Sequence, residues 1–316
     1  MDIRVFTGNV HPKLAAETCR FLGMAVSPAT VGRFKDREVR VELGESVRGV
    51  DAFVIQPTPA PADTWFELLL LIDALRRSSA ERITAVISYC GYACQDRKDK
   101  PHVPISIELV GQLVQRAGAD RVLLLDLHNE TTIAFFGKQT DHLYASTVLV
   151  PACRELGVNP NEWVAVASDV GRAERTRGFA KRIHPDLPVA VIDKRRTGDA
   201  QTEVMNVIGE IKDKNLLLFD DMIRTASTVI GDTKVLKKAG AQRIVSCVTH
   251  LNLTEGTVER ILGSDVELVI ATDSLPFQPP VGPQAKRFSI VSIAELLAKA
   301  VRRIHDNQSV TELYLQ

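Results

Sequence analysis

The sequence has few cysteines, few aromatic residues and no excess of charge of either sign. Its 316 residues include five cysteines, and Phe, Trp and Tyr together make up 5% of the chain. The cysteines follow no metal-ligand spacing, so a zinc site built from them is not expected. An odd number of cysteines without an export signal is typical of reduced thiols, which predicts a cytoplasmic protein.

The charge balance and the lack of long apolar runs exclude two classes of partner. The 39 Lys and Arg residues are matched by 39 Asp and Glu residues, so the chain lacks the basic excess of a sequence-independent nucleic-acid-binding or membrane-binding surface. The longest apolar stretch, 68–72, ends at Glu67 and Asp73 and is far too short to span a bilayer. We therefore expect neither nucleic acid nor a membrane as partner.

Short apolar runs alternate with segments of helical periodicity along the whole chain. Alternation of this kind, with strands that are apolar throughout, is typical of α/β proteins whose parallel sheets are covered by helices on both faces. The predicted helices include 64–77, 106–116, 173–182 and 228–238. The predicted strands include 52–55, 83–87, 121–125, 164–167, 189–192, 215–219 and 244–248.

An internal similarity predicts two related domains. Residues 80–86 resemble residues 241–247, and a strand, a polar loop and an amphipathic helix precede each copy. The similarity favours duplication without proving it, because residues 118–122 show the same local pattern. We predict domains at 1–146 and 147–292, with a final helical segment, 293–316, that packs back on the first domain.

The most informative stretch of the chain is 215–229. A predicted buried strand ends in Asp220 and Asp221, a loop rich in hydroxyl groups follows, and a helix begins near Thr228. Ligands bind beyond the carboxyl ends of parallel strands, and a helix N-terminus beside Thr and Ser hydroxyls binds anions. Paired carboxylates bind sugar hydroxyls or a divalent cation, so the stretch favours a phosphorylated ribose. The plainer alternative is that the acids begin a turn and Thr228 caps a helix.

This stretch resembles the phosphoribosyl pyrophosphate-binding signature of the type I phosphoribosyltransferase fold. Other motifs in the same order resemble one branch of that fold, the ribose-phosphate pyrophosphokinase family, nearly from end to end. The resemblance implies two phosphoribosyltransferase-type domains, each with a mainly parallel sheet. The motifs are 31–38, 45–49, 92–101, 126–128, 141–144, 168–171, 193–196 and the terminal His305, Ser309 and Val310.

The resemblance implies a reaction and roles for its residues. The family transfers the pyrophosphoryl group of ATP to the anomeric hydroxyl of ribose 5-phosphate, with Mg²⁺ as cofactor. Lys194 and Arg196 would act as catalytic residues in a mobile surface loop. His128 would contact the metal and the nucleotide phosphates, and Asp169 would be a second metal ligand. The residues that would hold ribose 5-phosphate are Asp220, Asp221, Thr225, Ala226, Ser227 and Thr228.

The resemblance also implies assembly and regulation. Phe34, Asp36 and Glu38 match residues that reach the ATP of a neighbouring subunit, and Gln95 matches the nucleotide-binding loop. A homo-oligomer, built from dimers that assemble into a hexamer, is therefore expected. A second anion site for phosphate or ADP would be formed by Ser46, Arg48, Ser309 and Thr311.

The sequence departs from the family pattern at several positions. Cys94 stands in place of an arginine that contacts ATP, and a thiol cannot supply the fork of charged donors that arginine offers to phosphates. Arg172 replaces a glycine that follows Asp169 in the pattern. Three further departures are Arg37, Arg224 and Ser227.

Three functions are compatible with these residues. An active pyrophosphokinase is favoured because Lys194, Arg196, His128, Asp169 and the acid pair are all present. The departures instead favour a non-catalytic subunit that regulates an active relative, which would bind ribose 5-phosphate without turnover. A phosphoribosyltransferase, which would require a base as acceptor, is the least favoured because the match extends to the ATP-side motifs.

Overall fold

The protein consists of two compact units, each built around one sheet. The computed structural model describes residues 1–137, 139–196 and 202–314, without the side chains of residues 195–196 and 202–205. Unit 1 contains residues 1–145, 274–276 and 292–316, and unit 2 contains residues 146–273 and 277–291. Within the described part of the chain, no helix has the length and apolar character needed to cross a membrane.

Unit 1 contains a five-stranded sheet in which every pairing is parallel. The predicted strands 52–55, 83–87 and 121–125 are confirmed, and all their residues except Arg121 are buried. In spatial order the strands are β1 (Ile3–Thr7), β4 (Asp51–Ile55), β5 (Arg82–Ile87), β6 (Arg121–Leu125) and β7 (Thr140–Leu143).

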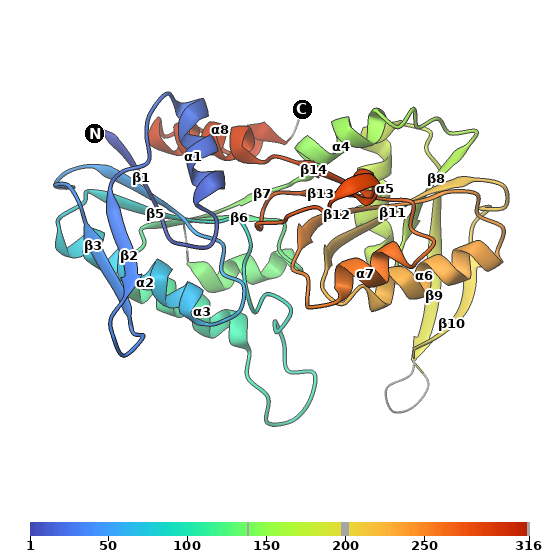
Figure 1. The fold of residues 1–316 in the computed structure, drawn as a ribbon, viewed down its shortest axis with the longest axis horizontal. Coiled ribbons are helices and arrows are strands. Elements are labelled where there is room, and N and C mark those ends of the chain that lie inside the picture. Colours follow the sequence, from blue (N-terminus) through green and yellow to red (C-terminus); the bar gives the residue numbers. More distant parts are fainter. Residues whose placement is uncertain (138, 197–201, 315–316) are drawn as a thin grey trace. The chain divides into compact units, whose positions relative to one another are not determined.

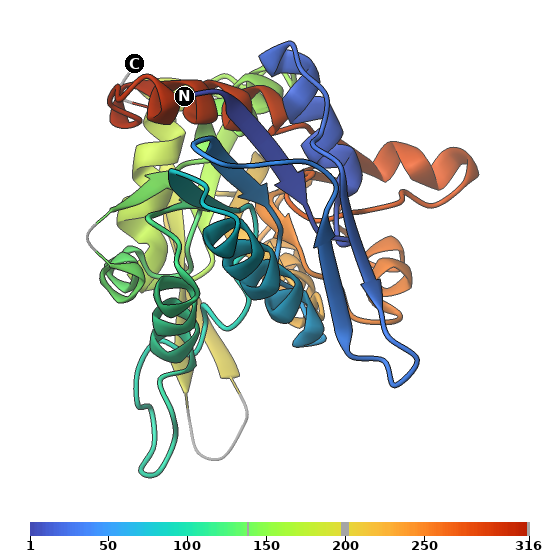
Figure 2. The same ribbon diagram turned by 90° about the vertical axis from the view of Figure 1, so that its left-hand side faces the viewer.

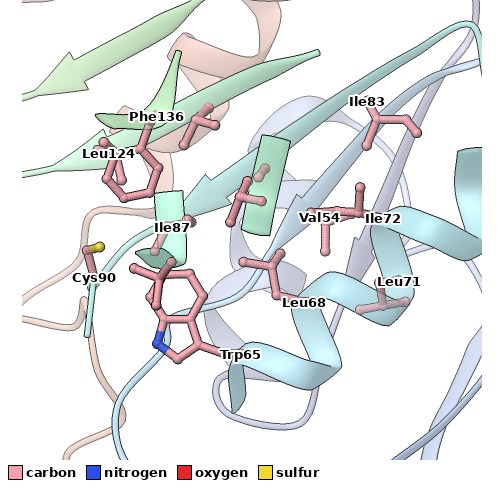
Figure 3. Packing of buried hydrophobic residues seen from close by; sticks show 14 of the residues in the cluster. Val54, Trp65, Leu68, Leu71, Ile72, Ile83, Ile87, Cys90, Leu124 and Phe136 are labelled. Carbon is pink, nitrogen blue, oxygen red and sulfur yellow. The ribbon is translucent and has the colours of Figure 1, made fainter. Parts of the chain in front are cut away.

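Helices cover both faces of this sheet (Figure 1). One face carries α2 (Asp63–Arg77) and α3 (Ser106–Ala117), and the other carries α1 (Pro12–Leu22) and α8 (Ala294–His305), which pack together. Trp65, Leu68 and Ile72 of α2 recur at helical spacing and point into the core (Figure 3). Burial of each such side chain contributes about 1.5–3 kcal/mol to the stability of the fold. This apolar stripe therefore holds α2 against the sheet.

Two segments of unit 1 extend beyond the sheet. The first is an antiparallel hairpin of β2 (Ala29–Arg33) and β3 (Val39–Leu43). The second is the loop 92–105 between β5 and α3. Both point away from α1 and α8 (Figures 1 and 2). The short helix η1 (Glu130–Phe136) lies beside α3.

Unit 2 contains a seven-stranded sheet that is parallel except for its edge strand β10. The predicted strands 164–167, 189–192, 215–219 and 244–248 are confirmed within β8, β9, β11 and β12. In spatial order the strands are β10 (Thr202–Ile208), β9 (Val189–Arg196), β8 (Trp163–Ala167), β11 (Asn215–Ile223), β12 (Ile244–Leu251), β13 (Leu268–Thr272) and β14 (Phe288–Val291).

Helices also cover both faces of the second sheet (Figure 1). The helices α4 (Ser146–Arg154) and α5 (Ala173–Ile183) lie on one face, and α6 (Ser227–Lys238) and α7 (Thr257–Leu262) lie on the other. The short helices η2 (Val170–Arg172) and η3 (Gly282–Arg287) follow β8 and precede β14. In each unit, a strand, a helix and a parallel neighbouring strand follow one another: β4–α2–β5 and β11–α6–β12. The predicted α/β class is therefore confirmed, and the two similar sequence segments begin equivalent strands.

Candidate functional site

Three carboxylates of unit 2 meet where β8 ends beside β11. The pairing of these parallel strands stops at Phe219 and Ala167, and β11 continues past that point. Asp220 and Asp221 lie in this extension, whereas Asp169 follows β8 directly. The carboxyl ends of parallel strands lie at one edge of a sheet, which explains how residues about 50 positions apart come together.

The guanidinium of Arg172 lies among these three carboxylates. Its Nη1 is 2.5 Å from Oδ1 of Asp220 and 2.9 Å from Oδ1 of Asp221, and its Nε is 3.5 Å from Oδ2 of Asp169. The Asp221 side chain is 2% exposed. Burial raises the pKa of Asp220 to about 7, and the positive charge of Arg172 opposes that rise. The cluster is therefore a partly buried ionic network with a cation inside it.

The loop after the acid pair begins helix α6. Ala226 has φ +57°, and this left-handed conformation turns the chain into the helix at Ser227. The N-cap residue Ala226 has no side chain that can cap the helix, and Thr225 Oγ1 accepts from the Ser227 amide at 3.4 Å. Thr228 does not cap the helix, because α6 begins one residue earlier, at Ser227. The plainer alternative for Thr228 is therefore wrong. Backbone amides at a helix N-terminus can bind an anion.

Hydrogen bonds from other elements hold this loop. The hydroxyl of Thr257 donates to the Arg224 carbonyl at 3.0 Å, and Thr225 Oγ1 donates to Ser227 Oγ at 3.1 Å. Arg260 of α7 donates from Nη2 to Ser227 Oγ at 3.2 Å. The sequence analysis did not single out Arg260, because nothing local to it indicates that α7 reaches the loop. Arg260 adds a second positive charge at this loop, which itself contains Arg224.

Lys194 lies in strand β9, not in the surface loop that the sequence analysis predicted. β9 runs to Arg196 because it pairs with the antiparallel strand β10. The charged residues of this segment do not by themselves indicate that such a partner strand exists. Nζ of Lys194 is 2.5 Å from Oδ1 of Asp232, a residue of α6 whose side chain is 2% exposed. The side chain of Arg196, and residues 197–201, lie outside the described part of the structure.

In unit 1, the segment around His128 follows strand β6. The Leu127 amide donates to Nε2 of His142 at 2.9 Å, and the Asn129 side chain donates to Oδ2 of Asp96 at 2.7 Å. The second contact ties the loop of Gln95 to the segment of His128. The Gln95 side chain also accepts a hydrogen bond from the hydroxyl of Ser106 at the start of α3. The structure thus brings the His128 segment and the Gln95 loop together.

The hairpin residues Phe34, Asp36 and Glu38 lie apart from that loop, at the turn between β2 and β3. The Phe34 side chain is 52% exposed, and the Glu38 amide donates to Asp36 Oδ1 at 3.2 Å. Arg37, which replaces a glycine of the family pattern, adopts φ +75°. The hairpin and α2 enclose a groove of about 650 Å³, which is lined by Arg33, Asp36, Arg37, Glu38, Val39, Asp63, Phe66 and Leu70.

The residues of the predicted second anion site lie on two exposed segments of unit 1. Ser46 and Arg48 precede β4, and Ser309 and Thr311 follow α8; all four are exposed. The buried Asp51 connects the two segments. It accepts from Arg82 Nε at 2.8 Å, and its Oδ2 lies 2.8 Å from Nδ1 of His305. Arg82 also donates to the side chain of Asn307 at 3.0 Å.

Comparison with known proteins decides the family. The model for the N-terminal domain of ribose phosphate pyrophosphokinase matches residues 3–118, and the model for the phosphoribosyl synthetase-associated domain matches residues 198–315. The ribose-phosphate pyrophosphokinase of Thermosipho africanus is 39% identical over 316 residues, which cover 100% of this chain and 98% of that protein. The chain belongs to the ribose-phosphate pyrophosphokinase family.

Other relatives agree with this assignment. The ribose-phosphate pyrophosphokinase of Rhizobium meliloti is 43% identical over 314 residues, with 99% of this chain and 100% of that protein covered. The crystal structure of phosphoribosylpyrophosphate synthetase from Mycobacterium smegmatis superposes with a TM-score of 0.89 at 35% identity, and covers 97% of this chain and 100% of that one. The resemblance inferred from the motifs is therefore confirmed for the whole chain.

The position of Gly91 has no space for a side chain. Gly91 begins the loop that carries Gln95 in this member of the pyrophosphokinase family. A Cβ atom there would lie 2.1 Å from the backbone oxygen of Thr58 and 3.2 Å from Nε1 of Trp65. We predict that Gly91→Ala lowers the free energy of unfolding by about 1–3 kcal/mol, because backbone atoms must shift. Urea denaturation measures the change. Gly32→Ala is the control, since nothing lies within 4 Å of its Cβ position; equal effects of the two substitutions would contradict the explanation.

The pair of Lys194 and Asp232 predicts a pH dependence of stability. Burial raises the pKa of Asp232 from 3.8 to about 6, although Lys194 opposes the shift. Between these two values the folded protein binds more protons than the unfolded chain, so this residue makes stability fall as the pH rises through that window. We expect Asp232→Asn to flatten the decline in urea-unfolding free energy across the window. An unchanged slope in the variant would show that Asp232 does not titrate as described.

Proposed function

We propose that the chain transfers the pyrophosphoryl group of ATP to the anomeric hydroxyl of ribose 5-phosphate, producing phosphoribosyl pyrophosphate and AMP. The observation that carries this proposal is the junction of β11 and α6. There, two carboxylates are followed a few residues later by a left-handed turn and a helix N-terminus. Asp220 and Asp221 bind the ribose hydroxyls, and the loop from Thr225 through Ala226 and Ser227 to Thr228 binds the 5-phosphate.

Lys194 and Arg196 stabilise the transferred group in this proposal. Phosphoryl-type transfer depends on positioning and charge neutralisation more than on covalent chemistry, so cations near the leaving and transferred phosphates supply much of the rate. Lys194 is held at Asp232 on α6, the helix that begins at the phosphate loop. Its ammonium is thereby kept on the element that orients the sugar phosphate.

Mg²⁺ is the proposed cofactor. Among the described residues, no group of three or more His, Cys, Asp and Glu side chains is arranged to hold a metal ion. Mg²⁺ does not need a site of three protein ligands, because it is commonly held by one or two carboxylates together with water and substrate phosphates. In unit 2, Asp169 is the proposed ligand, and its side chain is 46% exposed. In unit 1, His128 is proposed to contact the metal and the nucleotide phosphates. When bound, the ion neutralises phosphate charge.

The nucleotide contacts imply an assembly. We propose that Gln95 binds ATP within one chain and that Phe34, Asp36 and Glu38 reach the ATP of a neighbouring subunit, in dimers that assemble into a hexamer. The exposure of Phe34 at the hairpin turn supports this, since Phe66 and Leu70 are also exposed in the adjacent groove and neighbouring exposed apolar side chains mark an interaction site. A phosphate or ADP site at Ser46, Arg48, Ser309 and Thr311 is proposed for regulation. The five free cysteines support a cytoplasmic location.

The proposal is tested by AMP formation from ATP, Mg²⁺ and ribose 5-phosphate with the purified full-length chain. We expect AMP to form only when the sugar phosphate is present, and EDTA to abolish it. A second assay supplies phosphoribosyl pyrophosphate and a nucleobase, and release of pyrophosphate there would indicate a phosphoribosyltransferase; we expect none. A folded protein that binds ribose 5-phosphate but forms no AMP, with or without inorganic phosphate, would instead support a non-catalytic regulatory subunit.

A further inference from the structure

Arg172 is held in the acid cluster by both its backbone and its side chain. Its amide donates to Oδ1 of Asp169 at 3.0 Å, and its guanidinium contacts Asp169, Asp220 and Asp221. The side chain is 22% exposed, so it is not a solvated surface arginine. These contacts come from η2, which directly follows β8, so the loop that carries Asp169 also supplies the cation beside it.

A cation is needed where these carboxylates meet. Three partly buried carboxylates repel one another unless a positive charge lies between them. A divalent cation would require six oxygen ligands at about 2.0–2.1 Å in the case of Mg²⁺. Nη1 of Arg172 instead lies 2.5 Å from Oδ1 of Asp220 and 2.9 Å from Oδ1 of Asp221. Each of these oxygens also accepts a backbone amide, from Asp221 at 2.8 Å and from Met222 at 3.0 Å, so the guanidinium takes the place that a metal ion would need.

We propose that Arg172 is the fixed cation of the acid pair, so that Asp220 and Asp221 bind the ribose diol without a divalent cation of their own. Arg172 is thus a positioning residue, and it determines whether binding of the sugar phosphate depends on metal. This inference rests on the proposed function, because it takes ribose 5-phosphate to be the ligand of the acid pair.

Arginine suits this role better than lysine. One guanidinium contacts all three carboxylates through two of its nitrogens, because its donors form a rigid planar fork. An ammonium is a single point charge on a flexible stem, and holding three acids from one position is harder for it. The order of metal-free affinity should therefore be Arg, then Lys, then Gly at position 172.

The experiment is calorimetric titration of ribose 5-phosphate into the full-length chain, in EDTA and in Mg²⁺, without ATP. We expect the wild type to bind with the same affinity in both. Arg172→Gly should bind about 10-fold more weakly in EDTA, the size of one lost charge-assisted contact, and Mg²⁺ should restore its affinity. Arg177→Ala is the matched control, since it removes the same charge from an exposed residue of α5 five positions further along the chain, and it should behave as the wild type does.

Electron paramagnetic resonance of Mn²⁺ gives a readout that does not depend on sugar affinity. In the presence of ribose 5-phosphate, Arg172→Gly should bind an additional Mn²⁺ relative to the wild type, and Arg172→Gly combined with Asp220→Asn should lose it. If the glycine variant does not fold, Arg172→Gln supports the same comparison, because it keeps a polar side chain and removes only the charge.

Two results would overturn the inference and leave the proposed function standing. One is a wild type whose binding of ribose 5-phosphate requires a divalent cation; the other is an Arg172→Gly variant that binds equally well in EDTA and gains no Mn²⁺. Absence of ribose 5-phosphate binding by the wild type under both conditions would instead count against the proposed function itself, and the inference would fall with it.

Discussion

Replacing Lys194 with alanine is expected to lower sugar-dependent AMP formation by about 100- to 1000-fold, the range for removal of one preorganised charge-stabilising group. The structure gives the reason for a large effect, because Lys194 pairs with Asp232 on the helix that starts at the proposed phosphate-binding loop. The affinity for ribose 5-phosphate, measured by calorimetry in parallel, should change little. A loss in turnover without a loss in sugar binding is the signature of an interaction made mainly in the transition state.

A second variant separates this chemistry from stability. Lys194→Ala removes the ion-pair partner of the buried Asp232 carboxylate, so the single variant should also unfold more easily. Combining it with Asp232→Asn should recover much of the stability and none of the activity. Recovery of turnover in the double variant would show that Lys194 acts only by neutralising Asp232.

Replacing Asp51 with alanine is expected to destabilise unit 1 by about 3–5 kcal/mol, the cost of removing one partner from a buried ionic network. Asp51 is completely buried, and it receives Arg82 from β5 and His305 from the end of α8. Without it, the Arg82 guanidinium loses its bidentate partner and α8 loses an anchor to β4. Hydrogen exchange of the amides in β5 and α8 measures the loss and localises it to unit 1.

Asp73→Ala is the control for the Asp51 variant. Asp73 pairs with Arg77 one helical turn later in α2, at 2.7 Å, and both side chains are exposed to solvent. An exposed pair of this kind contributes only about 0.2–1 kcal/mol. If Asp51→Ala and Asp73→Ala had similar effects, the Asp51 network would not anchor α8.

The sequence was most informative where the determinants are contiguous. Apart from Asn215, the strands 52–55 and 215–219 are apolar runs whose burial on both faces follows from the run itself, and the structure confirms them. The acid pair, the small loop and the start of α6 likewise follow one another along the chain. Strand β10 was harder to predict, because its place at the sheet edge depends on pairing with β9. The same pairing explains why Lys194 lies in a strand.

The contacts that sequence reasoning missed all join separate elements. Arg172 was recognised as a departure from the family pattern, but its position among three carboxylates depends on β8 and β11 being neighbours. The sequence around Asp232 and Arg260 did not indicate a role for either residue. Asp232 matters because it pairs with Lys194, and Arg260 because it donates to Ser227. Residue type and spacing predict which groups are available, whereas the sheet order decides which of them meet.

The central claim is that this chain makes phosphoribosyl pyrophosphate by moving two phosphoryl groups of ATP as a unit. Phosphorus-31 NMR of a reaction with ATP, Mg²⁺ and ribose 5-phosphate tests it most directly. We predict equal growth of AMP and of a coupled pair of pyrophosphate resonances on the anomeric carbon of the sugar, with no ADP. Accumulation of ADP with a singly phosphorylated anomeric position, or release of free pyrophosphate with AMP and unchanged ribose 5-phosphate, would contradict the account.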